Sequence, residues 1–229
     1  MANQSEKKTA YLFENIWTIP NIISFIRILL IPVFGVLFYK GELLWALLIL
    51  AFSGLTDFVD GKLARKLNQV SELGKMLDPI ADKLTQATIA IVYFLSFRNA
   101  ENETLRLFSW VFLLFIAKEL VMLIGGAIMI AVGIRPGAAE IYGKAATLIF
   151  YVVMVVIMAF GPEIGAFRAG EGAIISLFTL PDAVMMVLVV ISLISTILAF
   201  LSYMPGVYKQ VKERFSEDGK KKAKEEAEK

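Results

Sequence analysis

Apolar residues occupy long, nearly uninterrupted runs in this chain, and polar or charged residues gather between the runs. Several runs reach about 20 residues, the length at which an α-helix crosses the hydrocarbon core of a bilayer. We therefore predict an all-α, polytopic membrane protein, built as a bundle of six transmembrane helices. The predicted spans cover residues 18–39, 43–65, 76–97, 105–132, 140–160 and 181–204.

The segments on either side of the spans differ from each other. Residues 1–17 are predicted to form a cytoplasmic or interfacial segment, residues 18–205 the six-helix transmembrane domain, and residues 206–229 a charged cytoplasmic tail. Aromatic and aliphatic side chains crowd just before Pro20. They fit either a short N-terminal helix lying in the membrane interface or a plain flank of the first span.

The composition excludes several kinds of site. The chain has 229 residues, of which 58% are hydrophobic, and it contains neither cysteine nor histidine. Disulfides and Cys/His zinc sites are therefore impossible, and any metal must be bound by oxygen atoms, which favours Mg²⁺, Mn²⁺ or Ca²⁺. The formal net charge of +2 is uninformative, and we expect no nucleic-acid partner.

Basic residues are distributed unevenly between the two sides that six spans define. An even number of spans places both termini on one side, and positively charged loops remain in the cytoplasm. We therefore expect a multi-pass protein of the cell membrane with both termini and the aspartate-rich segment on the cytoplasmic side. That side receives Lys7, Lys8, Arg65, Lys66, Lys75, Arg135, Lys144 and the eight basic residues of the tail, and the other side receives Lys40, Arg98, Arg106 and Arg168.

Four aspartates lie within one stretch of twenty-six residues, close to runs long enough to cross a bilayer. An ionised carboxylate is costly in such a place and is usually functional. If the second span stays helical through Arg65, Asp57 and Asp60 share one stripe at i and i+3, while Asp78 and Asp82 are i and i+4 at the start of the third span. Antiparallel packing of the two helices would then make a cage suited to two divalent cations.

The residues beside the aspartates favour a phosphate ligand. Gly61 and Ala64 are small enough for a ligand to approach the helix backbone closely, and Arg65 suits bidentate contact with phosphate. Singly, each residue also has an ordinary structural interpretation, such as Asp78 as the N-cap of a helix that starts at Pro79. Together, these residue types at these spacings indicate a site for metal ions and pyrophosphate.

The pattern D-x2-D-G-x2-A-R-x8-G-x3-D-x3-D, from Asp57 to Asp82, resembles the signature of the CDP-alcohol phosphotransferases, and every fixed position matches. The resemblance extends over most of the chain and implies an enzyme that joins a CDP-linked group to an alcohol and releases CMP. It also implies a homodimer that uses two divalent cations, Mg²⁺ or Mn²⁺. By this resemblance Asp57, Asp60, Asp78 and Asp82 bind the metals, Asp82 also acts as base, and Gly61, Ala64, Arg65 and Gly74 contact the CDP moiety.

Within this family the chain looks most like the bacterial phosphatidylglycerophosphate synthases, which implies transfer of the phosphatidyl group of CDP-diacylglycerol to glycerol-3-phosphate. The alternative is a CMP-forming cardiolipin synthase, whose acceptor is phosphatidylglycerol. Gly126 and Ala146 stand where the former enzymes tend to carry basic residues, and this thinner basic set favours an acceptor without a terminal phosphate. The general resemblance keeps glycerol-3-phosphate as the expected acceptor. The candidate acceptor-binding residues are Asn21, Arg27, Lys118, Arg135 and Lys144.

Two further expectations concern the interior of the bundle. Because adjacent residues do not share a helix face, Lys118 and Glu119 are expected to have different partners. A remote alternative function is a cation transporter that uses the aspartates as an ion path. That alternative leaves Gly61, Ala64 and Arg65 without a role.

Overall fold

The computed structural model describes residues 18–66, 72–131, 141–169 and 177–216. Every regular element in these ranges is a helix, which confirms the predicted all-α class. The helices are α2 (Ile19–Tyr39), α3 (Leu43–Lys66), α4 (Glu72–Arg98), α5 (Glu103–Phe108), α6 (Trp110–Ala131), α7 (Ile141–Phe160) and α8 (Asp182–Phe215).

Five stretches of described helix are long and apolar enough to cross a membrane, so the chain is a multi-pass membrane protein. The predicted second span corresponds to α3. Within its described side chains α3 is apolar over Leu43–Thr56, and its backbone stays helical to Lys66, through the aspartate-rich segment. The five stretches are Ile19–Tyr39, Ile80–Arg98, Glu103–Met129, Tyr142–Phe160 and Asp182–Lys212.

Several helix ends differ from the prediction. The predicted span 105–132 is divided at Ser109, whose Oγ donates a hydrogen bond of 2.7 Å to the carbonyl of Arg106. Helix α4 begins at Glu72, so Asp78 lies inside the helix and the N-cap interpretation of this residue is wrong. Helix α8 continues to Phe215, well beyond the predicted end of the last span, despite an internal proline at position 205.

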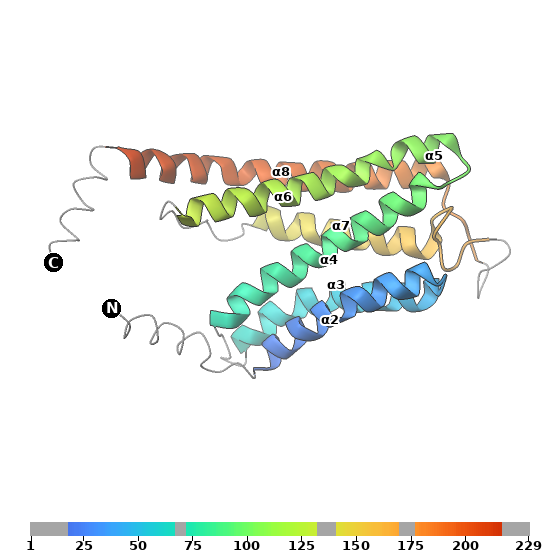
Figure 1. Cartoon of the computed structure of the whole chain (residues 1–229), viewed down its shortest axis with the longest axis horizontal. Coiled ribbons are helices and arrows are strands. Elements are labelled where there is room, and N and C mark those ends of the chain that lie inside the picture. Colours follow the sequence, from blue (N-terminus) through green and yellow to red (C-terminus); the bar gives the residue numbers. More distant parts are fainter. Residues whose placement is uncertain (1–17, 67–71, 132–140, 170–176, 217–229) are drawn as a thin grey trace.

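Helix α4 connects the two parts of the bundle. Figure 1 shows it running diagonally from the start of α2 and the end of α3 to the turn that leads into α5. It packs against α2 and α6, while α7 packs against both α3 and α8. We call the end formed by the start of α2, the end of α3 and the start of α4 the aspartate end, and the opposite end the α5 end.

Aromatic side chains fill the core between α4, α6 and α7. The ring centroids of Tyr93 and Phe112 lie 5.5 Å apart, and the contacts continue from Phe112 through Phe115 to Phe150, with Phe115 and Phe150 5.3 Å apart. The last ring is Tyr151, 5.8 Å from Phe150. Since such rings bury large apolar areas and pack edge to face, this chain of contacts fixes where α7 lies relative to α4.

Candidate active site

The backbone places the aspartate motif on two packed helices. Helix α3 remains helical to Lys66 and therefore carries Asp57 and Asp60 on one stripe, as predicted, and α3 contacts α4, which carries Asp78 and Asp82. Gly74 is buried near the start of α4. Apart from Gly74 and Asp82, the structure describes only the backbone of the motif residues. These residues are Asp57, Asp60, Gly61, Ala64, Arg65 and Asp78.

Asp82 is held from three directions. Its Oδ1 accepts a hydrogen bond of 2.8 Å from Gln86 Nε2, one turn further along α4, and lies 3.5 Å from the hydroxyl of Tyr151 on α7. Its Oδ2 lies 3.5 Å from Lys83 Nζ, and 15% of the side chain is exposed. The carboxylate is therefore oriented by polar groups but is not sealed from solvent or ligand.

An ion-pair cluster extends from Asp82 to α6. Lys83 Nζ lies 3.1 Å from Glu119 Oε2, and the other Glu119 oxygen pairs with Lys118. The prediction that Lys118 and Glu119 have different partners is wrong in part, because the flexible lysine side chain reaches its neighbour. The cluster Asp82, Lys83, Lys118 and Glu119 contains two carboxylates and two ammonium groups, so its formal charges cancel.

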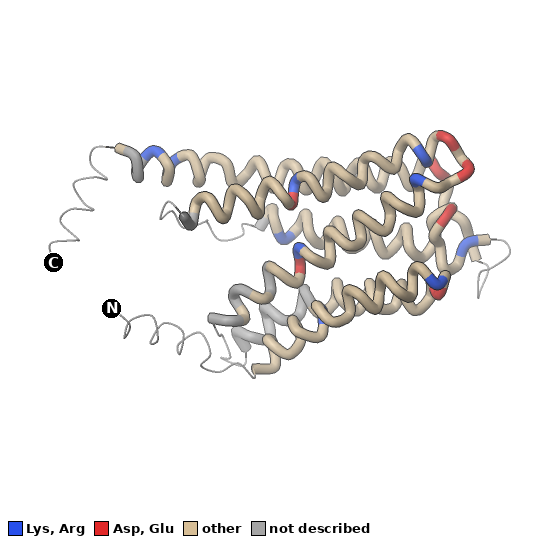
Figure 2. The backbone as a smooth tube through the Cα atoms, in the orientation of Figure 1, with Lys and Arg blue, Asp and Glu red and all other residues tan. Residues whose placement is uncertain are grey.

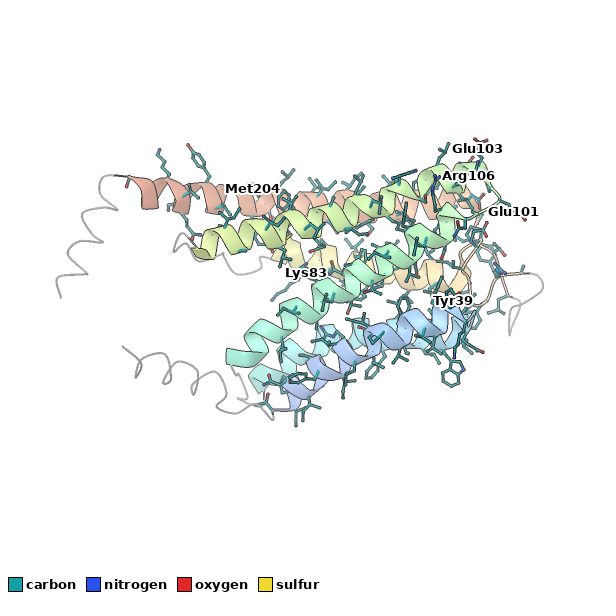
Figure 3. The ribbon with its side chains drawn as sticks, viewed as in Figure 1. Tyr39, Lys83, Glu101, Glu103, Arg106 and Met204 are labelled. Atoms are coloured by element: carbon teal, nitrogen blue, oxygen red, sulfur yellow. The ribbon has the colours of Figure 1, made fainter. Side chains whose placement is uncertain are left out.

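This cluster lies within the bundle rather than at its ends. In Figure 2 most Asp and Glu positions of the described chain are at the α5 end, and few charged positions lie between the two ends. Figure 3 shows Lys83 part-way along α4, away from the α5 end, where Tyr39, Glu101 and Glu103 are labelled. Charged groups inside a membrane bundle are costly and mark functional sites.

Helix α2 buries its polar side chains and exposes its apolar ones. Asn21, Ser24 and Arg27 are at most 1% exposed, whereas large apolar residues such as Leu29 (68%) are exposed. Thr18 begins this face and caps the helix by accepting a hydrogen bond from the Asn21 N–H (3.3 Å). In a bilayer this inverted pattern places the polar stripe against α3 and α4, so Asn21 and Arg27 point into the bundle, as expected for site residues.

A small cavity lies where this stripe meets α3 and α4. Arg27, Ser53, Thr85 and Thr88 are among the residues around it, but almost all of its lining surface is apolar, and its volume is about 10 Å³, room for about one water molecule. Ser53 is 4% exposed, and its Oγ has no hydrogen-bond partner among the described residues. Thr85 is one turn from Asp82 on α4, so the cavity adjoins the site from the side of α2.

The two remaining candidate acceptor residues are Arg135 and Lys144. Lys144 is exposed near the start of α7. Its neighbour Gly143 lies against the hydroxyl of Tyr203 on α8, with no room for a Cβ atom. Arg135 lies outside the described residues. The structure therefore brings Asp82 and Lys118 into one cluster and leaves Lys144 at the surface.

The whole described bundle corresponds to one family. Residues 17–202 match the model of the family described as CDP-alcohol phosphatidyltransferase. The chain belongs to this family. The match covers α2 to α7 and most of α8, and it includes the aspartate motif, which supports the resemblance found in the sequence.

Relatives of this CDP-alcohol phosphatidyltransferase carry two kinds of name. The chain is 38% identical to the CMP-forming cardiolipin synthase of Streptomyces coelicolor over 147 residues, which are 62% of this chain and 65% of the relative. It is 49% identical to the human CMP-forming cardiolipin synthase over 86 residues, 37% of this chain and 28% of the relative. It is 35% identical to the CDP-diacylglycerol–glycerol-3-phosphate 3-phosphatidyltransferase of Aquifex aeolicus over 130 residues, 57% and 69% of the two chains. The chain thus spans less than two thirds of the first and second of these relatives.

Sequence reasoning missed two residues that contact Asp82. Gln86 could have been found, since a glutamine at i+4 from an aspartate in an apolar run suggests a side-chain hydrogen bond. Tyr151 could not, because it lies in an unbroken apolar segment of α7, and only the packing of α7 on α3 and α4 brings it to Asp82. The contact of Tyr151 with Asp82 joins residues 69 positions apart in the sequence, whereas Gln86 is 4 positions from Asp82.

Proposed function

We propose that this chain is a CMP-forming cardiolipin synthase. It would transfer the phosphatidyl group of CDP-diacylglycerol to a hydroxyl of phosphatidylglycerol and release CMP. Family membership supports the reaction class, and the names of the Streptomyces coelicolor and human relatives support this acceptor over glycerol-3-phosphate. The preference reverses the order expected from the sequence alone.

The observation that carries the proposal is the balanced charge of the cluster beside Asp82. Lys118 pairs with Glu119, and Lys83 lies between Glu119 and Asp82. Glycerol-3-phosphate ends in a phosphomonoester with nearly two negative charges at neutral pH, and it requires cationic donors that are not already paired. Phosphatidylglycerol offers a glycerol hydroxyl without a terminal phosphate, so a neutral cluster suits it better.

Asp82 is the proposed base in this reaction. The acceptor hydroxyl attacks the phosphorus that bears diacylglycerol, the bond from that phosphorus to the CMP oxygen breaks, and the hydroxyl proton passes to the Asp82 carboxylate. Because the chain has no histidine, a carboxylate is the simplest base. Gln86 holds Oδ1 at 2.8 Å, and Oδ2, which lies 3.5 Å from Lys83 Nζ, would take the proton.

The aspartates are the proposed metal ligands. The chain supplies only oxygen donors because cysteine and histidine are absent, and that donor set fits Mg²⁺ or Mn²⁺. Asp57, Asp60 and Asp78, with Asp82 beside them, would hold two such cations, which offset the charge of the pyrophosphate when bound. Gly61, Ala64, Arg65 and Gly74 would contact the CDP moiety.

Acceptor binding is assigned to polar and basic residues of α2, α6 and α7, together with Arg135. Asn21 and Arg27 of the polar stripe on α2 would contact the phosphodiester or glycerol of the acceptor, together with Lys118, Arg135 and Lys144. The headgroups reach this site from the cytoplasm in our proposal, with both chain termini on the same side. A homodimer in the cell membrane is the proposed assembly.

The test is CMP release by the purified protein from CDP-diacylglycerol with Mn²⁺ or Mg²⁺. The acceptors compared are phosphatidylglycerol and glycerol-3-phosphate, and Asp82→Asn protein is the control for contaminating activity. Release with phosphatidylglycerol supports the proposal. Release with glycerol-3-phosphate alone would establish the second candidate, which the Aquifex aeolicus relative favours.

A further inference from the structure

Tyr151 contacts both helices that carry the aspartates. Its hydroxyl lies 3.5 Å from Asp82 Oδ1 on α4. Its ring lies against Gly54 on α3, where an added Cβ atom would come within 3.1 Å of Tyr151 Cδ1. Gly54 precedes Asp57 by three residues, about one helical turn on the same side of α3. The side chain is 5% exposed, so both contacts are inside the bundle.

The ring is fixed independently of the hydroxyl. Phe150 lies 5.8 Å from Tyr151 between ring centroids and is itself packed on Phe115 of α6. Gly54 gives the opposite wall, because a Cβ atom there would require the ring to move by a few tenths of an ångström. Consequently the phenol oxygen has little freedom, and its distance to Asp82 depends on the separation of α3, α4 and α7.

Gln86 and Tyr151 donate toward the same Asp82 oxygen. Gln86 belongs to the same helix as Asp82, so its hydrogen bond sets the local rotamer of the carboxylate. Tyr151 belongs to α7, and its ring also contacts α3, so its hydroxyl couples the position of the carboxylate to the position of α3. The 3.5 Å separation is long for an O–H···O hydrogen bond, as is common for catalytic groups in unliganded sites.

We propose that Tyr151 is a positioning residue, which sets the Asp82 carboxylate relative to the aspartates of α3 through its hydroxyl on Asp82 and its ring on Gly54. This inference rests on the role of Asp82 as base in the proposed function. Small misplacements of a catalytic group lower the turnover rate steeply. Loss of the hydroxyl therefore lowers kcat and raises the Mn²⁺ concentration needed for half-maximal activity, while KM for the lipid substrates changes little.

Tyr151→Phe removes the hydroxyl and keeps the ring. Tyr93→Phe is the matched control, since Tyr93 is also fully buried and its hydroxyl donates to a backbone carbonyl, that of Met154, at 2.6 Å. We expect kcat of Tyr151→Phe to fall by about tenfold, with KM within about twofold of wild type. Tyr93→Phe should keep kcat and the Mn²⁺ dependence while its melting temperature falls.

A second variant tests the other contact. Gly54→Ala pushes on the ring of Tyr151, and we expect the same fall in kcat with KM preserved. Should Gly54→Ala protein fail to fold, the comparison of Tyr151→Phe with Tyr93→Phe still decides. Wild-type kcat and Mn²⁺ dependence in Tyr151→Phe overturn the inference, as does an equal fall of kcat in Tyr93→Phe.

Failure of the inference and failure of the proposed function give different results. The kinetics are measured with whichever acceptor supports CMP release, so the inference is tested whether or not phosphatidylglycerol is the substrate. Retained activity in Asp82→Asn contradicts the proposed base and the inference with it. Inactive Asp82→Asn together with fully active Tyr151→Phe overturns the inference alone.

Discussion

Lys83 of α4 and Glu119 of α6 form an ion pair inside the bundle, with 3.1 Å between Nζ and Oε2. The Glu119 side chain is 9% exposed and also pairs with Lys118, so one carboxylate contacts two lysines. The same Lys83 ammonium lies 3.5 Å from Asp82. The pairing therefore joins the candidate base to a second helix.

Replacement of Glu119 by leucine leaves Lys118 without its carboxylate and leaves Lys83 with Asp82 alone. Breaking a buried pair from one side is strongly destabilising, by about 3 kcal/mol, and the part due to the more exposed Lys83 is smaller. The double variant Lys118→Met/Glu119→Leu should recover part of this loss because it buries one charge fewer. Unfolding in detergent measures the stability of both variants. The account would be contradicted if the double variant lost as much stability as Glu119→Leu, or lost the sum of the two single losses.

The pair Glu103 and Arg106 is a matched control for this experiment. These side chains are 78% and 45% exposed, and their charged atoms lie 3.9 Å apart at the α5 end. An exposed pair contributes little to stability. We therefore expect Glu103→Leu to unfold at the wild-type detergent concentration, so a clear shift in this variant would argue that leucine itself, rather than charge, causes the effect.

Asp82→Asn should remove activity without unfolding the protein. The amide oxygen of asparagine can still accept the hydrogen bond from Gln86 (2.8 Å in wild type), but the side chain cannot take a proton. General bases contribute about 10²–10⁴-fold to rate, so CMP release should fall by at least about 10²-fold. The melting temperature should stay near that of wild type, and retained CMP release would exclude Asp82 as the base.

The stability cost of a substitution at Gly143 should depend on the hydroxyl of Tyr203. A Cβ at Gly143 meets the hydroxyl at the far end of the Tyr203 side chain, so Gly143→Ala displaces that side chain and costs about 1 kcal/mol. In a Tyr203→Phe background the hydroxyl is absent, and the same substitution should cost clearly less. Thermal unfolding of the four proteins tests this, and identical costs in both backgrounds would rule out the contact.

Activity should depend on a divalent cation held by the motif aspartates. EDTA should stop CMP release, and Mg²⁺ or Mn²⁺ should restore it, because the available ligands are oxygen atoms. Asp57→Asn and Asp78→Asn should raise the cation concentration needed for half-maximal activity or abolish activity. Asp182→Asn is the control, since Asp182 begins α8 and accepts a hydrogen bond from Asn102 (2.7 Å); an equal effect there would contradict a specific metal site.

The sequence predicts the helices well because their main signal, apolar length, is local. The all-α class and the five long apolar stretches among the described residues follow from it. The ends were less predictable. Glu72 and Phe215 extend α4 and α8 into polar sequence, where helix formation depends on neighbouring structure rather than on hydropathy.

The candidate site was predictable only where its residues are close in sequence. The motif from Asp57 to Asp82 depends on fixed spacings along two consecutive helices, and the family match supports it. The pairing of Lys83 with Glu119 and the approach of Tyr151 to Asp82 depend on packing between distant helices. No single-sequence pattern contains that information, nor the pairing of Lys118 with Glu119 on which the proposed change of acceptor depends.

The most direct test of the proposed function identifies the lipid product. Purified protein is reconstituted in vesicles that contain CDP-diacylglycerol and phosphatidylglycerol with a deuterated headgroup, and glycerol-3-phosphate and Mn²⁺ are added. Mass spectrometry of the extracted lipids should find cardiolipin that carries the deuterated glycerol, with an equal amount of CMP. Phosphatidylglycerophosphate as the product, with the deuterated lipid unchanged, would contradict the account.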